Sequence, residues 1–378
     1  METASSLYIK HHSFKDFFSS LNTDIDAQRH RVFHYFKNND VGVHKSIGQA
    51  ILRDLTSTSP DVDFKITPHI ADELSRIEDK DIGRYAVNHY RYDVYPKKKI
   101  LDAYPPYLQI EPTSVCNYRC VFCYQTDNEF TAKANGHMGA MSFDFFKEII
   151  DQAQGNIEFF SLASRGEPLL CKDIDKMLEY CRGKFLGLKI NTNASMLNEQ
   201  HCHAILSGGV NTIVFSADAA KEPLYSQLRV KGNLQKVLSN IRLFQEIRRK
   251  QYPSSKIITR VSGVKYGSDQ DMDSMVSLWG ELVDQISFVA YNPWENVYNA
   301  PVNETKIACS DLWRRMFIWF DGMANPCDTD FKSTLSSGNF KTHSISELWR
   351  SERYEDLRKT HLEKKRGSLS PCQRCVVV

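Results

Sequence analysis

Residues 107–123 read YLQIEPTSVCNYRCVFC, a short and mostly apolar run followed directly by three cysteines in the spacing CxxxCxxC. With 10 cysteines in 378 residues, one such triple would arise by chance in only about 0.7% of chains of this composition. Three thiolates on one tight loop can hold three irons of a cubane cluster and leave the fourth iron open. A structural zinc ion needs four ligands, and no further Cys or His follows before His137. The segment therefore predicts an iron–sulfur cluster on a loop that follows a β-strand.

A regular alternation continues along the chain from this first strand. Short runs rich in β-branched and aromatic residues alternate with longer amphipathic runs, which is typical of repeated βα units around a parallel sheet. Strands are predicted at 107–113, 157–163, 187–193, 212–218, 256–264 and 286–292. Helices are predicted around 142–154, 173–182, 198–207, 234–250 and 271–283. The fold class is therefore α/β.

Two further segments flank these units. Residues 1–100 carry no recognisable chemistry and are expected to form a helical N-terminal extension, either a cap on the central domain or a surface for a partner. The central domain is expected to span 101–300. Residues 301–378 are expected to form a small C-terminal domain, with a β-hairpin that turns at Asp321-Gly322 and a helix over 345–362.

The composition is that of an ordinary soluble protein, with 42% hydrophobic and 25% charged residues and a net charge of +2. The basic runs at 97–99 and 364–366 are short and favour solvated surface, so no nucleic-acid partner is expected. No stretch is apolar for long enough to span a bilayer, and the first residues lack the order of a secretion signal. We therefore expect no membrane partner and a cytoplasmic location, where clustered cysteines are metal ligands or reactive thiols rather than disulfides.

The cysteine loop resembles that of the radical S-adenosylmethionine (SAM) superfamily, in which an aromatic residue precedes the third cysteine, as Phe122 does here. In that family the open iron binds the amino and carboxylate groups of SAM, and an electron from the cluster splits SAM into a 5′-deoxyadenosyl radical that abstracts hydrogen. The resemblance implies a 4Fe-4S cluster on Cys116, Cys120 and Cys123. It also implies a partial (β/α)6 TIM-like barrel over roughly 105–295, and an electron donor such as flavodoxin or ferredoxin.

Several later motifs follow predicted strands in the order found in that family. Ser164-Arg165-Gly166-Glu167-Pro168 resembles its GGEP motif, with Arg165 in place of the first glycine. Alone, each motif is equally well explained as an ordinary turn or a surface residue, but together they lie where barrel active sites are assembled. Arg229 matches a family arginine that pairs with the SAM carboxylate, for which a planar guanidinium is suited. The resemblance implies these cofactor-binding residues: Phe122, Gly166, Glu167, Asn191, Asn193, Ser216, Asp218 and Arg229.

A second cysteine group lies in the C-terminal segment, at Cys309, Cys327, Cys372 and Cys375. Their arrangement resembles the twitch domain, a shortened SPASM extension in which four cysteines hold one auxiliary 4Fe-4S cluster. Because the sequence stops three residues after the last of them, only one auxiliary cluster is expected. The remaining cysteines are expected to pack in the interior, and they are Cys171, Cys181 and Cys202.

Complete cysteine ligation would leave the auxiliary cluster without an open iron, which favours electron transfer over substrate coordination. Twitch enzymes oxidise aminocyclitol or sugar alcohols, so the resemblance implies a radical SAM oxidoreductase that dehydrogenates such an alcohol, free or carrier-bound. The alternatives are a radical SAM epimerase, a peptide or protein maturase and, outside enzymes, an iron–sulfur electron carrier or scaffold. No residue is marked as the proton acceptor, although four are candidates by position: Tyr291, Glu295, Asp328 and Asp330.

Overall fold

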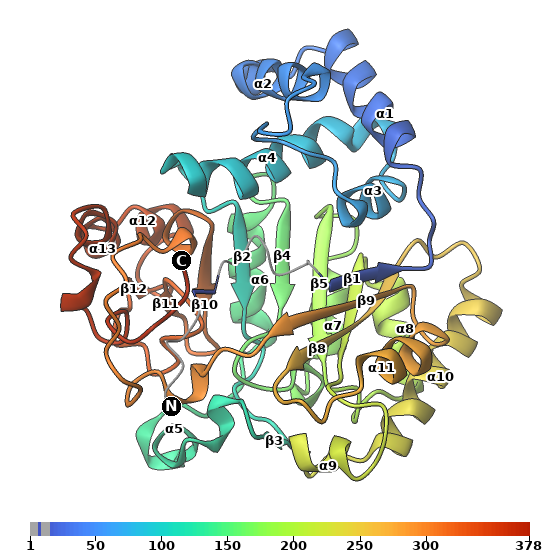
Figure 1. Ribbon diagram of the computed structural model, residues 1–378, viewed down its shortest axis with the longest axis vertical. Helices are drawn as coiled ribbons and strands as arrows, with labels where there is room; N and C mark the ends of the chain where they lie inside the picture. The colour runs from blue at the N-terminus through green and yellow to red at the C-terminus, as the bar shows by residue number, and fades with distance from the viewer. Residues whose placement is uncertain (1–6, 9–15) are drawn as a thin grey trace.

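The computed structural model describes residues 7–8 and 16–378, which form an α/β structure around one large sheet (Figure 1). Six strands of this sheet are parallel and follow one another in chain order, as predicted. They are β2 (Tyr107–Ile110), β4 (Phe159–Leu162), β5 (Gly187–Thr192), β6 (Thr212–Ser216), β8 (Ile258–Lys265) and β9 (Gln285–Ala290). The helices between them are α6 (Phe143–Ala153), α7 (Ile174–Tyr180), α8 (Glu199–Ser207), α10 (Leu234–Gln251) and α11 (Met272–Gly280). The predicted βα units are therefore confirmed.

The two faces of the parallel strands differ in chemistry. On β5, Leu188 and Ile190 are buried in the main hydrophobic core with the helices, while Lys189 and Asn191 are half-buried on the opposite face. Successive side chains of a strand point to opposite faces, so β5 presents its polar residues to the face opposite the helices. The inner face of the sheet is thus polar, as a site for a polar ligand requires.

The sheet is extended at both edges by the chain termini. Strand β10 (Arg315–Ile318) pairs in parallel with β2 and forms the predicted hairpin with β11 (Met323–Asn325) and its neighbour β12 (Gly338–Asn339). The hairpin turn places Gly322 at φ +91°, a conformation that glycine adopts without steric cost. At the other edge, β1 (Asp16–Ser19) pairs antiparallel with β9.

Two sequence expectations need correction. The N-terminal extension is not wholly helical, because it contains β1, which belongs to the sheet. Strand β1 has only four residues, which are too few to show the alternation typical of a strand. The expected helix over 345–362 is two helices, α12 (Ile345–Trp349) and α13 (Glu352–Leu362), because the Ser351 side chain accepts a hydrogen bond from the Tyr354 N–H and starts a new helix.

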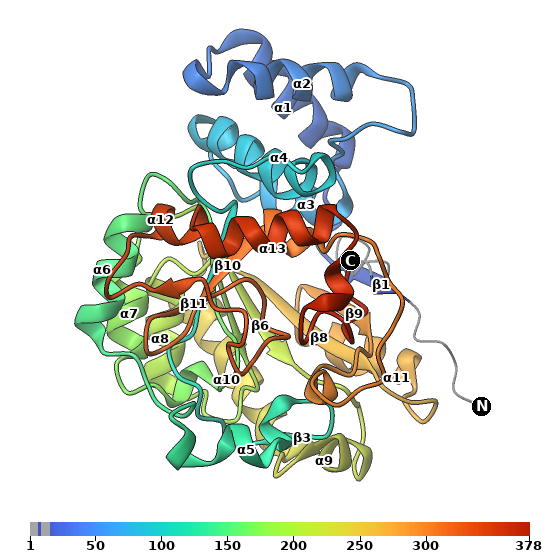
Figure 2. The same ribbon diagram turned by 90° about the vertical axis from the view of Figure 1, so that its left-hand side faces the viewer.

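The N-terminal helices gather at one end of the molecule in both views (Figure 1, Figure 2). These are α1 (Ile25–Asn38), α2 (Lys45–Thr56), α3 (Pro68–Leu74) and α4 (Ile82–Lys98). Their core includes Tyr107 and Phe159, the first residues of β2 and β4, so the extension covers the N-terminal ends of the strands. The loops after the strands, with α5 (Asn128–Thr131) and α9 (Leu224–Leu228), lie at the opposite end. No helix of the described residues is both long and apolar enough for a membrane span.

Candidate functional site

The loop after β2 carries the first three cysteines and is fixed from two sides. Strand β3 (Arg119–Cys120) pairs antiparallel with β7 (Arg229–Val230), so that Cys120 lies opposite Arg229. The Arg119 guanidinium donates to the carbonyl oxygens of Cys116 (2.9 Å) and Tyr118 (2.7 Å). The cysteine loop is therefore held by its own arginine and by the segment that follows α9.

The donor set of this loop fits an iron–sulfur cluster. Burial raises the pKa of the Cys116 thiol to about 12. Burial also raises the pKa of Cys123, and Cys120 and Cys116 add to this rise. The three thiols therefore lie near one another. The Tyr118 N–H donates to the Cys116 sulfur (3.4 Å), and the Arg229 Nη1 donates to the Cys120 sulfur (3.7 Å). Thiolates select iron–sulfur clusters, and hydrogen bonds to sulfur adjust their potential.

The segment that resembles GGEP packs directly against the cysteine loop. A Cβ on Gly166 would lie 2.3 Å from the Thr113 oxygen and 2.6 Å from the Val115 oxygen, so only glycine fits there. The adjacent Glu167 N–H donates to the Val115 oxygen at 2.9 Å. The Glu167 carboxylate, whose pKa is raised by burial, accepts from the Asn193 N–H at 2.7 Å. This segment thus joins the cysteine loop to the end of β5.

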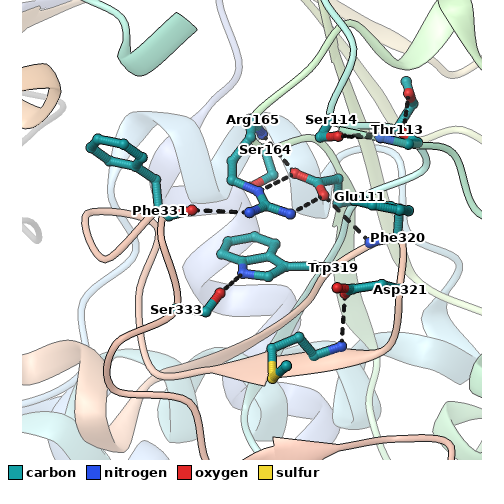
Figure 3. Close-up of polar contacts among 12 residues, drawn as sticks. Glu111, Thr113, Ser114, Ser164, Arg165, Trp319, Phe320, Asp321, Phe331 and Ser333 are labelled. Carbon is teal, nitrogen blue, oxygen red and sulfur yellow. Dashed lines mark hydrogen bonds and ion pairs between the residues drawn. The ribbon is translucent and has the colours of Figure 1, made fainter. Parts of the chain in front are cut away.

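Arg165, which replaces a family glycine, is fully paired (Figure 3). Its Nε and Nη2 donate to the two carboxylate oxygens of Glu111 at 2.8 and 2.6 Å, and both side chains are buried. Its Nη1 donates to the Phe331 carbonyl at 2.9 Å, and the guanidinium lies 4.3 Å from the Trp319 ring centroid. Trp319 in turn donates to Ser333 at 2.9 Å. Arg165, which differs from the family motif, therefore joins the region of the first cysteine loop to the C-terminal segment.

Asp218, which follows β6, and Arg229 of β7, both expected to contact SAM, form one buried ion pair. The Arg229 Nε lies 2.6 Å from the Asp218 carboxylate, which also accepts from the Val264 N–H at 2.6 Å. The Arg229 guanidinium lies 5.9 Å from the Phe122 ring centroid. Asp218 therefore holds Arg229 beside the cysteine loop.

The polar residues after β5 and β6 differ in their hydrogen bonding. Asn193 donates to Asn117 (3.0 Å) and accepts from the Ser195 hydroxyl (2.6 Å), so it belongs to the cysteine loop network. Asn191 has a buried carbonyl oxygen without a hydrogen-bond partner in the described structure. Ser216 is half-buried at the end of β6. The lone acceptor of Asn191 fits a ligand that brings its own donor, as the ammonium and ribose groups of SAM do.

The four C-terminal cysteines also converge. Cys309 precedes β10, Cys327 follows β11, and Cys372 and Cys375 lie in the last loop. Burial, Asp330 and the other three thiols all raise the pKa of Cys327 far above its ordinary value. Four neighbouring thiols without a disulfide fit a fully cysteine-ligated cluster.

Two buried basic residues that sequence reasoning missed hold this second site. Arg366 donates to four backbone carbonyls, among them those of Cys372 (3.3 Å) and Cys375 (2.9 Å). His361 accepts from the Cys309 N–H at 3.1 Å, and burial lowers its pKa to about 3, so it is neutral. Neither residue has a motif or a period that could have indicated its role.

An aromatic cluster lies between the two cysteine sites. The ring centroids of Tyr124 and Phe331 are 5.1 Å apart and those of Phe331 and Tyr298 are 5.0 Å apart. Cys123 of the first site and Cys375 of the second both pack against this cluster. By contrast, the three other cysteines are buried in the main core, as predicted: Cys171, Cys181 and Cys202.

A cavity of about 880 Å³ lies at the N-terminal ends of the strands, between the sheet and helices α3 and α4. Among its lining residues is Lys189 of β5, whose amine has no hydrogen-bond or ion-pair partner in the described part of the chain. Burial, together with Arg260 and Arg315, lowers the pKa of Lys189 to about 8. The Tyr107 ring centroid is 5.7 Å from the amine. An amine in this state can accept a proton near neutral pH.

The partial barrel and its two thiol sites define an iron–sulfur protein with a polar cavity. Residues 110–278 match the model of the radical SAM superfamily, and residues 309–376 match that of SPASM, an iron-sulfur cluster-binding domain. The chain therefore contains a radical SAM domain followed by a SPASM-type iron–sulfur cluster-binding domain. Its cofactors are accordingly SAM, a 4Fe-4S cluster and an auxiliary iron–sulfur cluster.

The chain also resembles curated relatives in sequence and solved structures in fold. GTP 3′,8-cyclase of Campylobacter lari is 34% identical over 140 residues, which are 36% of this chain and 41% of the relative. The chain spans about half the length of the curated relatives it matches. Streptococcus suis SuiB bound to S-adenosylmethionine superposes with a TM-score of 0.51 at 16% identity, over 93% of this chain and 88% of SuiB. The structure of anSMEcpe with bound AdoMet gives 0.52 at 16% identity, over 71% and 88%. These likenesses show the fold.

Proposed function

We propose that this radical SAM enzyme is an oxidoreductase that dehydrogenates a sugar or aminocyclitol-type alcohol, free or carrier-bound. The observation that carries the proposal is the combination of a four-thiol auxiliary site with a polar cavity whose amine, Lys189, lies on the same face of β5 as Asn191, two residues nearer the start of the strand. A polar cavity suits a substrate rich in hydroxyl groups, because each buried hydroxyl must find a partner.

Residues at the end of the strands would hold the cofactors. The first 4Fe-4S cluster would bind to Cys116, Cys120 and Cys123, and the auxiliary cluster to the four C-terminal cysteines. SAM would contact residues around the first site: Phe122, Gly166, Glu167, Asn191, Asn193, Ser216, Asp218 and Arg229. When bound, SAM and its cluster supply the radical that removes the carbinol hydrogen, and the auxiliary cluster accepts the electron left on that carbon.

The chain itself must accept the hydroxyl proton, and we assign this role to the Nζ of Lys189. A proton acceptor is most effective when its pKa is close to the working pH. Lys189 meets this condition, since burial and two neighbouring arginines lower its pKa to about 8. Among the acceptors considered from sequence, Asp330 instead accepts hydrogen bonds from Thr334 and Leu335 of its own loop and from the Tyr298 hydroxyl.

The arrangement of the spare cysteines argues against epimerisation. A radical epimerase needs a hydrogen donor beside its substrate, often a thiol. Cys171, Cys181 and Cys202 are buried in the core between sheet and helices, on the side away from the inner face. An iron–sulfur carrier or scaffold would need neither the cavity nor its amine.

The test uses aminocyclitols and hexoses that carry deuterium on their carbinol carbons. The full-length protein, reconstituted without oxygen, should move deuterium from one of these alcohols into 5′-deoxyadenosine and form one carbonyl product per SAM. Lys189→Met should lose carbonyl formation, whereas Lys176→Met, an exposed lysine on α7, should not. Deuterium transfer that ends in an inverted alcohol instead of a carbonyl would overturn the oxidation.

A further inference from the structure

Three potential metal ligands meet where α3 and α4 line the cavity. His69 and Glu73 lie one turn apart on α3, and His89 faces them from α4. The His69 Nε2 is 3.5 Å from one Glu73 oxygen, and the His89 Nε2 is 3.6 Å from the other. One ligand atom from each residue can be chosen so that all three lie within 4.8 Å of one another. In residues 7–8 and 16–378, no other group of three His, Cys, Asp or Glu residues meets this criterion.

The separations fit ligands of a common ion better than hydrogen bonds. Hydrogen bonds between imidazole and carboxylate are about 2.7–3.2 Å long. Two atoms that each lie about 2.0–2.2 Å from one tetrahedral ion are about 3.3–3.6 Å apart. Both His–Glu73 separations fall in or beside the second range. Because each imidazole faces a different oxygen of Glu73, and one ligand atom from each residue can be chosen within 4.8 Å of the others, the spacing fits an ion that Glu73 binds through one or both oxygens.

Asp93 and Tyr85 contact His89 and Glu73 from outside the group of three ligands. Asp93, one turn after His89 on α4, has its carboxylate 3.6 Å from the His89 Nδ1, an ion-pair distance, while the Nε2 faces Glu73. The buried Tyr85 hydroxyl donates to Glu73 at 2.6 Å. Ligating histidines commonly present their second nitrogen to a carboxylate, and ligating carboxylates are themselves hydrogen-bonded.

These side chains could instead form a group of ion pairs that joins α3 to α4. Although burial lowers the pKa of His89, Asp93 and Glu73 raise it to about 9, so without an ion this imidazole is protonated. Ion pairing alone explains the position of His89 between the carboxylates of Glu73 and Asp93. It does not require the second imidazole, His69, on the remaining oxygen of Glu73.

We propose that His69, Glu73 and His89 bind one divalent transition-metal ion such as Zn²⁺, with its open coordination position toward the cavity. Two imidazoles and one carboxylate are a donor set of catalytic zinc sites, in which water or substrate takes the fourth position. An oxygen of the cavity ligand would occupy that position here. The proposal gives the N-terminal extension a chemical role, and its ligand set is argued from geometry, in the same cavity that the proposed function assigns to the alcohol.

The test counts bound Mn²⁺ by electron paramagnetic resonance in the full-length protein with both clusters reconstituted and oxidised. Mn²⁺ favours nitrogen and oxygen ligands over thiolates, and Zn²⁺ should displace it because Zn²⁺ binds such sites more tightly. We expect one Mn²⁺ per chain, released by one equivalent of Zn²⁺. His69→Ala and Glu73→Gln should each weaken binding at least tenfold, while SAM cleavage in both variants verifies their fold.

His203→Ala is the matched control. His203 and Glu199 have the same i, i+4 spacing on α8 at 3.8 Å, but no third ligand joins them in the described residues. This variant should bind Mn²⁺ as the unmodified chain does. No bound Mn²⁺ or Zn²⁺ in the unmodified chain, or equal binding in His69→Ala, would overturn the proposal. Either outcome leaves SAM cleavage at the first cysteine site untouched, so failure of the metal proposal is distinguishable from failure of the radical SAM chemistry.

Discussion

At the scale of single residues, Arg165 and Lys189 differ in how their positive charge is stabilised. Arg165 is surrounded by acceptors and aromatic rings, with both oxygens of Glu111 within 2.8 Å. Lys189 has no such partner in the described structure, and its pKa falls to about 8. Burial disfavours the charged form of any lone amine. The first residue is thus suited to hold structure and the second to exchange a proton.

Lys189 makes turnover depend on pH. Only the neutral amine accepts a proton, so alcohol oxidation should rise as the pH passes through about 8 and then level. Lys189→Met should lower turnover about 10²–10⁴-fold and remove this rise, while SAM cleavage without substrate stays unchanged. A pH–rate profile that is identical in the variant would exclude Lys189 as acceptor. Burial lowers the pKa of Lys189, and the neighbouring groups that also affect it are Tyr92, Glu73, Arg260 and Arg315.

Arg165 makes stability depend on one buried ion pair. Arg165→Gln leaves the Glu111 carboxylate buried without its cation, which should cost about 3–5 kcal/mol in the free energy of unfolding. Urea unfolding of the variant would measure this cost. Arg182→Gln is the control, because its pair with Glu179 is 3.9 Å long and mostly exposed, and it should cost less than about 1 kcal/mol. Equal costs would mean that the buried pair contributes no more than a surface contact.

At the scale of elements, the fit of one turn against another controls the first cysteine loop. A side chain at Gly166 would displace the backbone at Thr113 and Val115. Gly166→Ala should therefore remove the first cluster and spare the second, so that iron falls from about eight to about four per chain. Gly267→Ala, at a glycine with open space around it, should keep all the iron. Full iron loading of Gly166→Ala would show that the loop can move aside.

The limits of sequence reasoning also appear at this scale. The six strands and the cysteine loop were predictable because period and spacing are local signals. No local pattern encodes the hydrogen bond between Arg165 and Phe331, which are far apart in the chain. The ion pair of Asp218 with Arg229 joins a loop after β6 to β7, and no helix or strand period predicts it. Lys189 belongs to no motif, and only the register of β5 places it on the inner face.

At the scale of the whole molecule, the N-terminal and C-terminal segments are both joined to the barrel. The backbone of Tyr8 pairs with Val376 and Val378, at 3.0 and 3.1 Å, beside the second cysteine site. Tyr124, Phe331 and Tyr298 join the two cysteine sites through stacked and edge-to-face rings. The two sites therefore belong to one packed unit, although their roles in the proposed oxidation differ.

The most direct test of this division compares the unmodified protein with Cys327→Ala under strictly anaerobic conditions, scoring 5′-deoxyadenosine and carbonyl product together. With a carbinol-deuterated substrate, the unmodified protein should form both in equal amounts. Cys327→Ala should still cleave SAM but form no carbonyl, whereas Cys202→Ala, in the hydrophobic core, should behave as the unmodified protein does. A carbonyl yield per deoxyadenosine in Cys327→Ala equal to that of the unmodified protein would contradict the proposed oxidation.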